Sequence, residues 1–358
     1  MHLRTHSRAR LGSLLDAAWL LGACLLTHCA RSASEPSAAE PAPLAYQSEP
    51  GPPASGATTT APLPLASPAP AASALEAPVI PPARPLEVPS DMALVPAGSF
   101  QMGADDEGEQ DERPAHEVTI AAFLLDLTEV TNGAYRECVE AKICRAASTL
   151  EDSRLTNGMA HVFRRPTHPV AGVSWDDAKT YCEWKGKRLP TEAEWERTAR
   201  ADDNRRYVWG NDAPDKQRHG VFGGKATTEP VGSYPAGKSA YGHLDLAGNV
   251  WEWVADDYDP FAYQRSTRGS GTPGSCAEIE AAQNQLRKEG KQGFTGTNPI
   301  PNECEKVLRG GAYNYKVEGL RNSNRVHHPA RFRIAVAGFR CARDLEPKPP
   351  ARPLEPKP

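Results

Sequence analysis

The feature that most restricts folding of this chain is a proline-rich stretch near its N-terminus. Of 34 prolines in 358 residues, 15 lie between Pro36 and Pro89, where Tyr46 is the single aromatic residue. Proline removes backbone hydrogen-bond donors, and a segment almost without aromatic side chains cannot bury a core. We therefore expect residues 24–87 to form a disordered linker, residues 88–345 to form a folded domain, and residues 346–358 to form a proline-rich tail.

The string PPARPLE occurs in both proline-rich segments, at residues 81–87 and 349–355. Compositional bias is enough to explain this repeat. The alternative is a docking motif in the polyproline II conformation, which proline-rich segments adopt without any core.

The first 23 residues have the layout of an export signal. Three arginines precede the apolar run LGSLLDAAWLLGAC, which is too short to span a membrane. Leu21-Gly22-Ala23-Cys24 resembles a bacterial lipobox, in which the cysteine is acylated, and Cys29 is the alternative acceptor. We therefore expect an exported lipoprotein, periplasmic or at the cell surface, that a lipid on Cys24 holds at a membrane surface.

The charge of the chain gives no support for nucleic-acid binding. Charged residues make up 24% of the sequence, and the formal net charge is −4. Nucleic-acid-binding domains carry a positive patch or a clear basic excess. We therefore expect no nucleic-acid partner.

Local signals along residues 88–345 predict an α+β domain. Residues 92–103 consist of an apolar strand, a Pro-Ala-Gly turn and a second strand, which predicts a β-hairpin. Ser174 is placed to cap a helix that ends before Gly186, and Thr191 opens a capping box for a helix through Ala201. Beyond Arg206 the chain is rich in Gly, Pro, Asn and Asp, so we expect much irregular structure there.

Six cysteines lie in the expected domain, an even number that favours disulfides in an exported protein: Cys138, Cys144, Cys182, Cys276, Cys304 and Cys341. Fifteen pairings are possible in principle. Cys138 and Cys144 could close a small loop, and Cys276 and Cys304 could bracket an insertion. No CxxC spacing is present, so a zinc ribbon is not indicated.

Five strings in the domain resemble the formylglycine-generating enzyme family, also called the sulfatase-modifying-factor domain. In chain order they are MALVPAGSFQMG, HPVAGVSWDDAKTYCEWKGKRLPTEAEWERTAR, YGHLDLAGNVWEWVADDY, LRGGAYN and AGFRCAR. The resemblance implies a C-type-lectin-like fold that is stabilised by calcium. It also implies a disulfide between Cys182 and the GFRC cysteine, Cys341.

The resemblance breaks at the residues that carry the family's chemistry. Active members oxidise a sulfatase cysteine to formylglycine with copper and dioxygen, using two cysteines that follow a Gly-Gly-Ser. Placing Gly310-Gly311 on that pattern puts Ala312 at the serine, Tyr315 at the first cysteine and Leu320 at the second. Soft thiolates select copper(I), so we expect no copper and no family-type catalytic residue in this chain.

Calcium is implied at the positions that match a family site: Asp245, Gly248, Val250 and Glu252. Two carboxylates with backbone carbonyls between them are hard oxygen ligands that suit this ion. The alternative is that Asp245 and Glu252 only form salt bridges to nearby arginines. Trp251 and Trp253 are expected in the core rather than in a ligand site.

Two function classes follow from these observations. The first is a non-catalytic binding or scaffolding module, whose groove beside the Gly-Gly turn takes a peptide or an anionic ligand with the help of Arg309, Arg321 and Arg325. The second is an oxidase of the family, or a related oxidoreductase, with a divergent active site. The sequence shows no GxSxG motif that would indicate serine-hydrolase chemistry.

Overall fold

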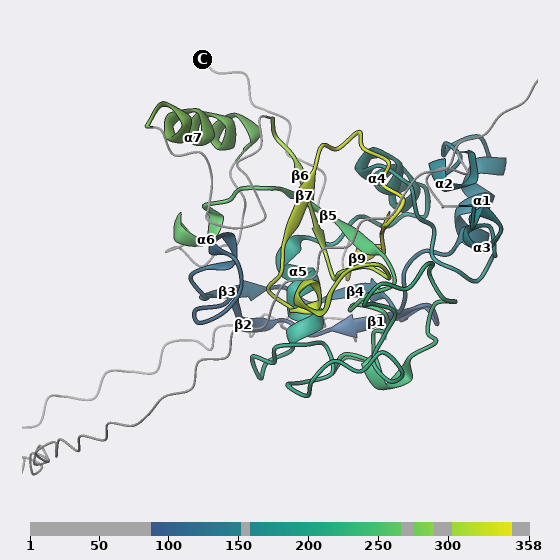
Figure 1. Cartoon of the computed structure of the whole chain (residues 1–358), viewed down its shortest axis with the longest axis horizontal. Coiled ribbons are helices and arrows are strands. Elements are labelled where there is room, and N and C mark those ends of the chain that lie inside the picture. Colours follow the sequence, from purple (N-terminus) through teal and green to yellow (C-terminus); the bar gives the residue numbers. More distant parts are fainter. Residues whose placement is uncertain (1–86, 152–157, 266–274, 290–302, 346–358) are drawn as a thin grey trace, which may run out of the picture. The chain divides into compact units, whose positions relative to one another are not determined.

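The structure, a computed structural model, describes residues 87–151, 158–265, 275–289 and 303–345, which lie within one compact unit that spans Ile80–Pro358. The expected export signal, the linker up to residue 86 and the C-terminal tail lie outside these residues. Short strands and helices are joined by long loops (Figure 1). This architecture confirms an α+β fold with much irregular structure. No helix in the described ranges is long and apolar enough to cross a membrane.

Two small sheets are formed mainly by strands from the first part of the domain sequence. The first has the antiparallel order β1 (Met92–Val95), β4 (Phe123–Asp126) and β9 (Ala342–Asp344), and the second pairs β2 (Gly98–Met102) with β3 (His116–Ile120). Strand β9 follows the last disulfide cysteine. The last strand of the described residues therefore lies beside β4, which precedes it by more than 200 residues.

The hairpin predicted for residues 92–103 is wrong, because β1 and β2 do not pair with each other. Met92 in β1 lies opposite Asp126 in β4, whereas Phe100 in β2 lies opposite Val118 in β3. The apolar residues of the two strands belong to different core clusters, so burial draws them into separate sheets. The turn between them redirects the chain instead of closing a hairpin.

The largest sheet has the order β7 (Val326–His328), β6 (Lys306–Arg309), β5 (Trp251–Asp257) and β8 (Ala337–Gly338), with β5 and β8 parallel. Alternate residues of a strand face the same side of a sheet, and Trp251 and Trp253 are 2% and 0% exposed. Both belong to the main core cluster, as predicted. Strand β5 thus contributes to the core and also pairs with β6, which ends directly before Gly310.

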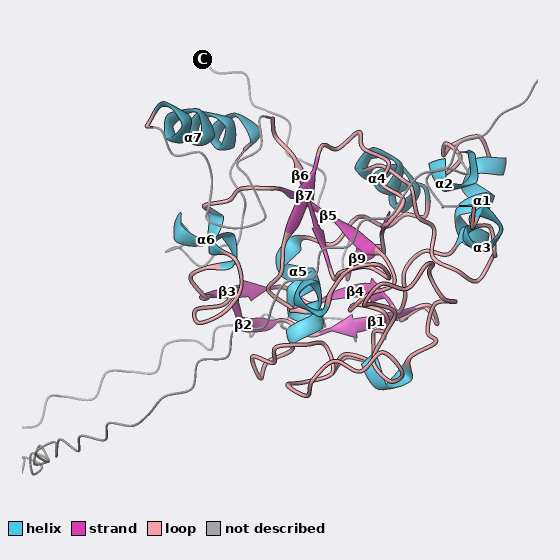
Figure 2. Ribbon diagram, in the orientation of Figure 1, coloured by secondary structure: helices cyan, strands magenta, loops and turns pink. Residues whose placement is uncertain are grey.

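Helices lie beside and between these sheets and are joined to them by long loops (Figure 2). They are α1 (Asn132–Glu140), α2 (Ser148–Glu151), α3 (Ala160–Phe163), α4 (Trp175–Trp184), α5 (Glu192–Arg200), α6 (Ala262–Arg265) and α7 (Cys276–Lys288), with 3-10 turns η1 (Gln110–Glu112), η3 (Pro235–Gly237) and η4 (Val317–Leu320). The capping boxes of α4 and α5 are present, which confirms both predicted helices.

Helix α7 was not predicted, because the region beyond Arg206 was expected to hold little regular structure. It begins with a capping box in which the side chain of Ser275 accepts a hydrogen bond from the backbone of Glu278. The Ser-x-x-Glu signal of this capping box is present in the sequence, but the nearby Gly and Gln residues favour an irregular segment.

The six domain cysteines form three disulfides, which are Cys138–Cys144, Cys182–Cys341 and Cys276–Cys304. The pair implied by the family resemblance, Cys182–Cys341, joins helix α4 to the residue before β9. Both of its cysteines are fully buried in the main core cluster.

Candidate functional site

The segment 308–325 turns sharply at Gly310 and Gly311, just after strand β6. Their φ angles are +96° and +81°, a left-handed region that favours glycine. A Cβ atom on Gly310 would lie 2.9 Å from the Leu246 carbonyl oxygen and 3.0 Å from the Trp195 ring. Glycine is therefore required here by both conformation and space.

The three residues that the sequence resemblance places at the family's reactive positions lie in different environments. Ala312 is fully buried, whereas Tyr315 is 39% exposed and packs edge-on against Trp251, with ring centroids 5.2 Å apart. Leu320 is 1% exposed and packs with Trp195 in a second core cluster. Only Tyr315 is in position to touch a ligand.

A pocket of about 530 Å³ lies beside Tyr315. Its lining includes Trp251, Tyr315, Lys316, Glu318, Asn324 and Val326. The indole Nε1 of Trp251 is buried and has no hydrogen-bond partner among the described residues. The pocket therefore combines the exposed aromatic ring of Tyr315 with polar and charged side chains.

The three arginines expected to contact a ligand are instead held by carboxylates of the domain. Arg309 and Arg325 are 0% and 1% exposed, and both bind Glu192 on helix α5 at 2.7 Å. Arg321 binds Glu112 at 2.6 Å. Arg321 and Arg325 do line the pocket, but their charge is already compensated, and Arg309 is not among the lining residues.

Glu112 organises the floor beneath the pocket. Its carboxylate accepts hydrogen bonds from Arg321, Ser323 and Asn324 at 2.6, 2.7 and 3.1 Å. Burial alone would raise the pKa of Glu112, but the charge of Arg321 and the hydroxyl of Ser323 hold it below its usual range. The segment after η4 is thus held in place by hydrogen bonds from three of its side chains to one buried carboxylate.

Residues 78–345 match the family described as "Sulfatase-modifying factor enzyme 1-like domain". The chain belongs to this family. The match covers the whole described domain, including the segment 308–325 and all six cysteines of the three disulfides.

Relatives of this sulfatase-modifying-factor domain carry different names. "Serine/threonine-protein kinase pkn1" of Chlamydia caviae is 33% identical over 273 residues, covering 74% of this chain and 39% of the kinase, so the chain spans about two fifths of that relative. "Formylglycine-generating enzyme" of Bos taurus is 35% identical over 219 residues, covering 47% of this chain and 58% of that protein. "Inactive C-alpha-formylglycine-generating enzyme 2" of Bos taurus is 34% identical over 219 residues, covering 47% of this chain and 71% of that protein.

A solved structure supports the fold. PvdO from Pseudomonas aeruginosa is 27% identical, with a TM-score of 0.52, and the match covers 71% of this chain and 94% of PvdO. The α+β sulfatase-modifying-factor fold that the motifs implied is therefore confirmed.

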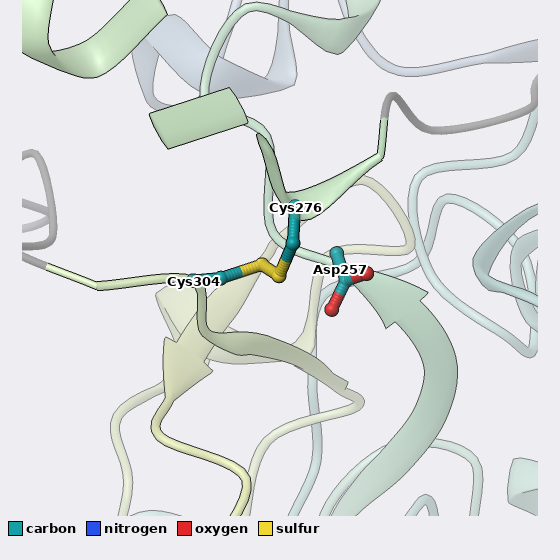
Figure 3. Close-up of side chains that lie close together, drawn as sticks. All are labelled: Asp257, Cys276 and Cys304. Carbon is teal, nitrogen blue, oxygen red and sulfur yellow. A yellow bond between two sulfur atoms is a disulfide. The ribbon is translucent and has the colours of Figure 1, made fainter. Parts of the chain in front are cut away.

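No cysteine in the described part of this sulfatase-modifying-factor domain is available to bind copper, because all six are disulfide-bonded. One group of potential metal ligands does cluster among the described residues: Asp257, Cys276 and Cys304 lie within 4.8 Å of one another (Figure 3). The two sulfur atoms are bonded to each other, and Asp257 pairs with Lys306 at 2.6 Å. The cluster is thus a disulfide beside an ion pair rather than a thiolate site.

The calcium ligand set implied by the family fits this domain only in part. The Glu252 carboxylate is bound through both oxygens by Arg340, at 2.7 and 2.8 Å, and also accepts a hydrogen bond from Trp195. Glu252 therefore forms the salt bridge that was the alternative, and it does not fit as a calcium ligand in this arrangement. Among the described residues no arginine forms an ion pair with Asp245, whose Oδ2 accepts a hydrogen bond from the Gly232 amide at 2.5 Å.

Sequence reasoning missed Glu129, which lies close to Asp245. It is 2% exposed and follows strand β4. A single carboxylate 116 positions before Asp245 gives no local signal, because only the fold brings the two residues together.

Proposed function

We propose that this chain is an exported, membrane-tethered sulfatase-modifying-factor protein that binds a ligand without oxidising it. The observation that carries the proposal is the lack of a thiol at both copper positions, which Tyr315 and Leu320 occupy. Neither side chain can supply the soft thiolate that copper(I) requires. One bovine relative bears the printed name of an inactive enzyme, which agrees with loss of activity within the family.

The environment of Leu320 strengthens the case against residual copper chemistry. Its side chain is 1% exposed and is not among the residues that line the pocket. Replacing a metal ligand with a core residue removes the ligand and also commits the position to packing. The 3-10 turn η4 therefore places the Leu320 side chain in the core.

The pocket favours a peptide over an anionic ligand. Arg321 and Arg325 line it, but Glu112 and Glu192 compensate their charges. Tyr315 offers aromatic surface, and the buried ring of Trp251 supports it edge-on. An extended peptide supplies an apolar side chain that can pack on such a surface.

Removing the Tyr315 ring tests this binding. We expect Tyr315→Ala to weaken binding of a fluorescent cysteine-containing sulfatase peptide at least tenfold, measured by fluorescence anisotropy. The matched control is Phe332→Ala, because Phe332 is 44% exposed and is not a pocket residue. Equal affinities for the wild-type protein and Tyr315→Ala would exclude this pocket as the peptide site.

The membrane tether has its own test. The lipobox-like sequence before Cys24 leads us to expect that the exported protein partitions into the detergent phase of Triton X-114. Cys24→Ala should move it to the aqueous phase, because one acyl-bearing cysteine supplies the anchor. Cys29→Ala is the control and should leave partitioning unchanged. A protein that stays in the detergent phase after Cys24→Ala would contradict the assignment.

A further inference from the structure

The disulfide between Cys276 and Cys304 is the most accessible of the three in the described part of the chain. Cys276 is exposed and Cys304 is partly exposed, whereas the four cysteines of the other two disulfides are at most 8% exposed. Thiol–disulfide exchange begins when a thiolate attacks a disulfide sulfur, so access to that sulfur controls its rate. A reducing dithiol therefore opens this bridge while the two buried bridges stay intact.

The surroundings of this bridge favour thiolates once it is open. Cys276 is the first residue of helix α7, which Ser275 caps. The N-terminus of a helix carries a partial positive charge, which stabilises a thiolate relative to a thiol. Lys306 adds a full positive charge beside the bridge, because its ammonium lies 2.6 Å from the neighbouring carboxylate of Asp257.

Asp257 supplies a third potential ligand at the same place. One of its carboxylate oxygens and the two sulfur atoms lie within 4.8 Å of one another (Figure 3). In a tetrahedral zinc site the Zn–S and Zn–O distances are about 2.3 and 2.1 Å, so the ligand atoms lie roughly 3.5–3.8 Å apart. The Cα atoms of Cys276 and Cys304 are 5.5 Å apart, which lets the two sulfurs separate by side-chain rotation when the bond between them opens.

We propose that reduction converts Cys276, Cys304 and Asp257 into a zinc site with two thiolate ligands, one carboxylate ligand and a fourth position for water. The reductant is a dithiol, whose first thiolate attacks one disulfide sulfur and whose second thiol resolves the mixed disulfide. The dithiol is thereby oxidised to a disulfide, and two electrons and two protons pass to the cysteines. Both protons leave when Zn²⁺ binds the thiolates.

The charges around the bridge suit a divalent ion. Two thiolates and one carboxylate carry three negative charges, which the two positive charges of Zn²⁺ and the single charge of Lys306 balance. Lys306 keeps a second partner when zinc takes the Asp257 oxygen, because its ammonium also lies 4.1 Å from the centre of the Trp175 ring. The segment 276–304 is thus closed by a disulfide in the oxidised chain and by zinc in the reduced chain.

Metal titration of the oxidised and the reduced chain tests the proposal. The protein is the full-length chain with Cys24→Ser and Cys29→Ser, which remove the two cysteines outside the domain. It is reduced briefly with dithiothreitol and desalted without oxygen, and mapping of alkylated peptides checks that only Cys276 and Cys304 are free. We expect the reduced chain to bind one zinc ion in competition with a chromogenic chelator, and the oxidised chain to bind none. Cobalt(II) in place of zinc should give a thiolate-to-metal charge-transfer band.

Three variants of the reduced chain identify the ligands. Asp257→Asn should weaken zinc binding at least tenfold and keep the cobalt charge-transfer band, since both thiolates remain. Cys304→Ser should lose most of that band. Asp256→Asn is the matched control, because it neutralises the adjacent carboxylate, which is buried and bound to the Glu192 amide, and it should bind zinc as the unaltered domain does. No zinc binding by the reduced chain, equal binding by the oxidised chain, or unchanged zinc affinity in Asp257→Asn would each overturn the assignment.

Discussion

At the scale of single residues, charge compensation in the core decides which side chains can meet a ligand. Arg309 and Arg325 look in sequence like a basic edge beside the Gly-Gly turn, yet both point into the protein and bind Glu192. The motif containing Glu192 predicts the start of a helix. It does not show that the Glu192 carboxylate binds residues more than 100 positions away. The sequence therefore showed which basic residues lie in this segment, but it did not show that they are buried.

Asp256 gives a prediction about pH at the same scale. It is 6% exposed, and burial together with the neighbouring Glu192 raises its pKa to about 7. An unfolded Asp has a pKa of about 3.9, so between about pH 4 and pH 7 the unfolded chain loses a proton that the folded chain keeps. The contribution of Asp256 to the free energy of unfolding is therefore highest below about pH 4 and falls as pH rises to about 7.

The Asp256→Asn variant should remove this fall. Its amide oxygen can still accept the hydrogen bond from the Glu192 backbone. Relative to the wild-type protein, we expect its free energy of unfolding to gain about 3 kcal/mol between pH 5 and pH 8. Urea denaturation at both pH values measures the difference. The same pH dependence in both proteins would show that Asp256 is ionised in the folded state.

At the scale of helices and strands, the sequence predicted the capped helices correctly but did not predict which strands pair. Helices α4 and α5 follow from capping residues within the same short segment. The hairpin expected at residues 92–103 failed because the partners of β1 and β2 come from later in the chain. Strand pairing depends on which apolar faces meet in the core, and a short window of sequence does not contain that information.

The disulfide between α4 and the residue before β9 leads to a prediction at this scale. Cys182 and Cys341 are separated by 159 residues, whereas Cys138 and Cys144 are separated by six. By loop entropy, the long bridge contributes about 5 kcal/mol and the short one about 2 kcal/mol to the free energy of unfolding.

Paired cysteine-to-alanine variants test these values. Removing Cys182 and Cys341 should lower the free energy of unfolding by more than twice the loss caused by removing Cys138 and Cys144. Chemical denaturation of the purified variants gives both values. If the two losses were equal, or a free thiol were found at Cys182 in the wild-type protein, the long bridge would not have the expected role.

At the scale of the whole molecule, the family fold is present, and Tyr315 and Leu320 occupy the positions that the resemblance assigns to the reactive thiols. The Gly-Gly turn, the buried ion pairs beneath it and the pocket beside Tyr315 form one connected region. The family motifs predicted the Gly-Gly turn from the sequence, because each motif is a short continuous string. They could not predict that Leu320 packs into the core or that Glu129 lies near Asp245, since both depend on how distant segments meet.

The central claim is that this domain binds without oxidising, and one measurement tests it most directly. The purified protein is incubated in air with a cysteine-containing sulfatase peptide, with and without added copper, and the peptide is weighed by mass spectrometry. Because Tyr315 and Leu320 supply no thiolate for copper(I), we expect the peptide mass to stay unchanged under both conditions. A loss of about 18 Da at the peptide cysteine, which is the difference between cysteine and formylglycine, would contradict the account and assign oxidase activity to this chain.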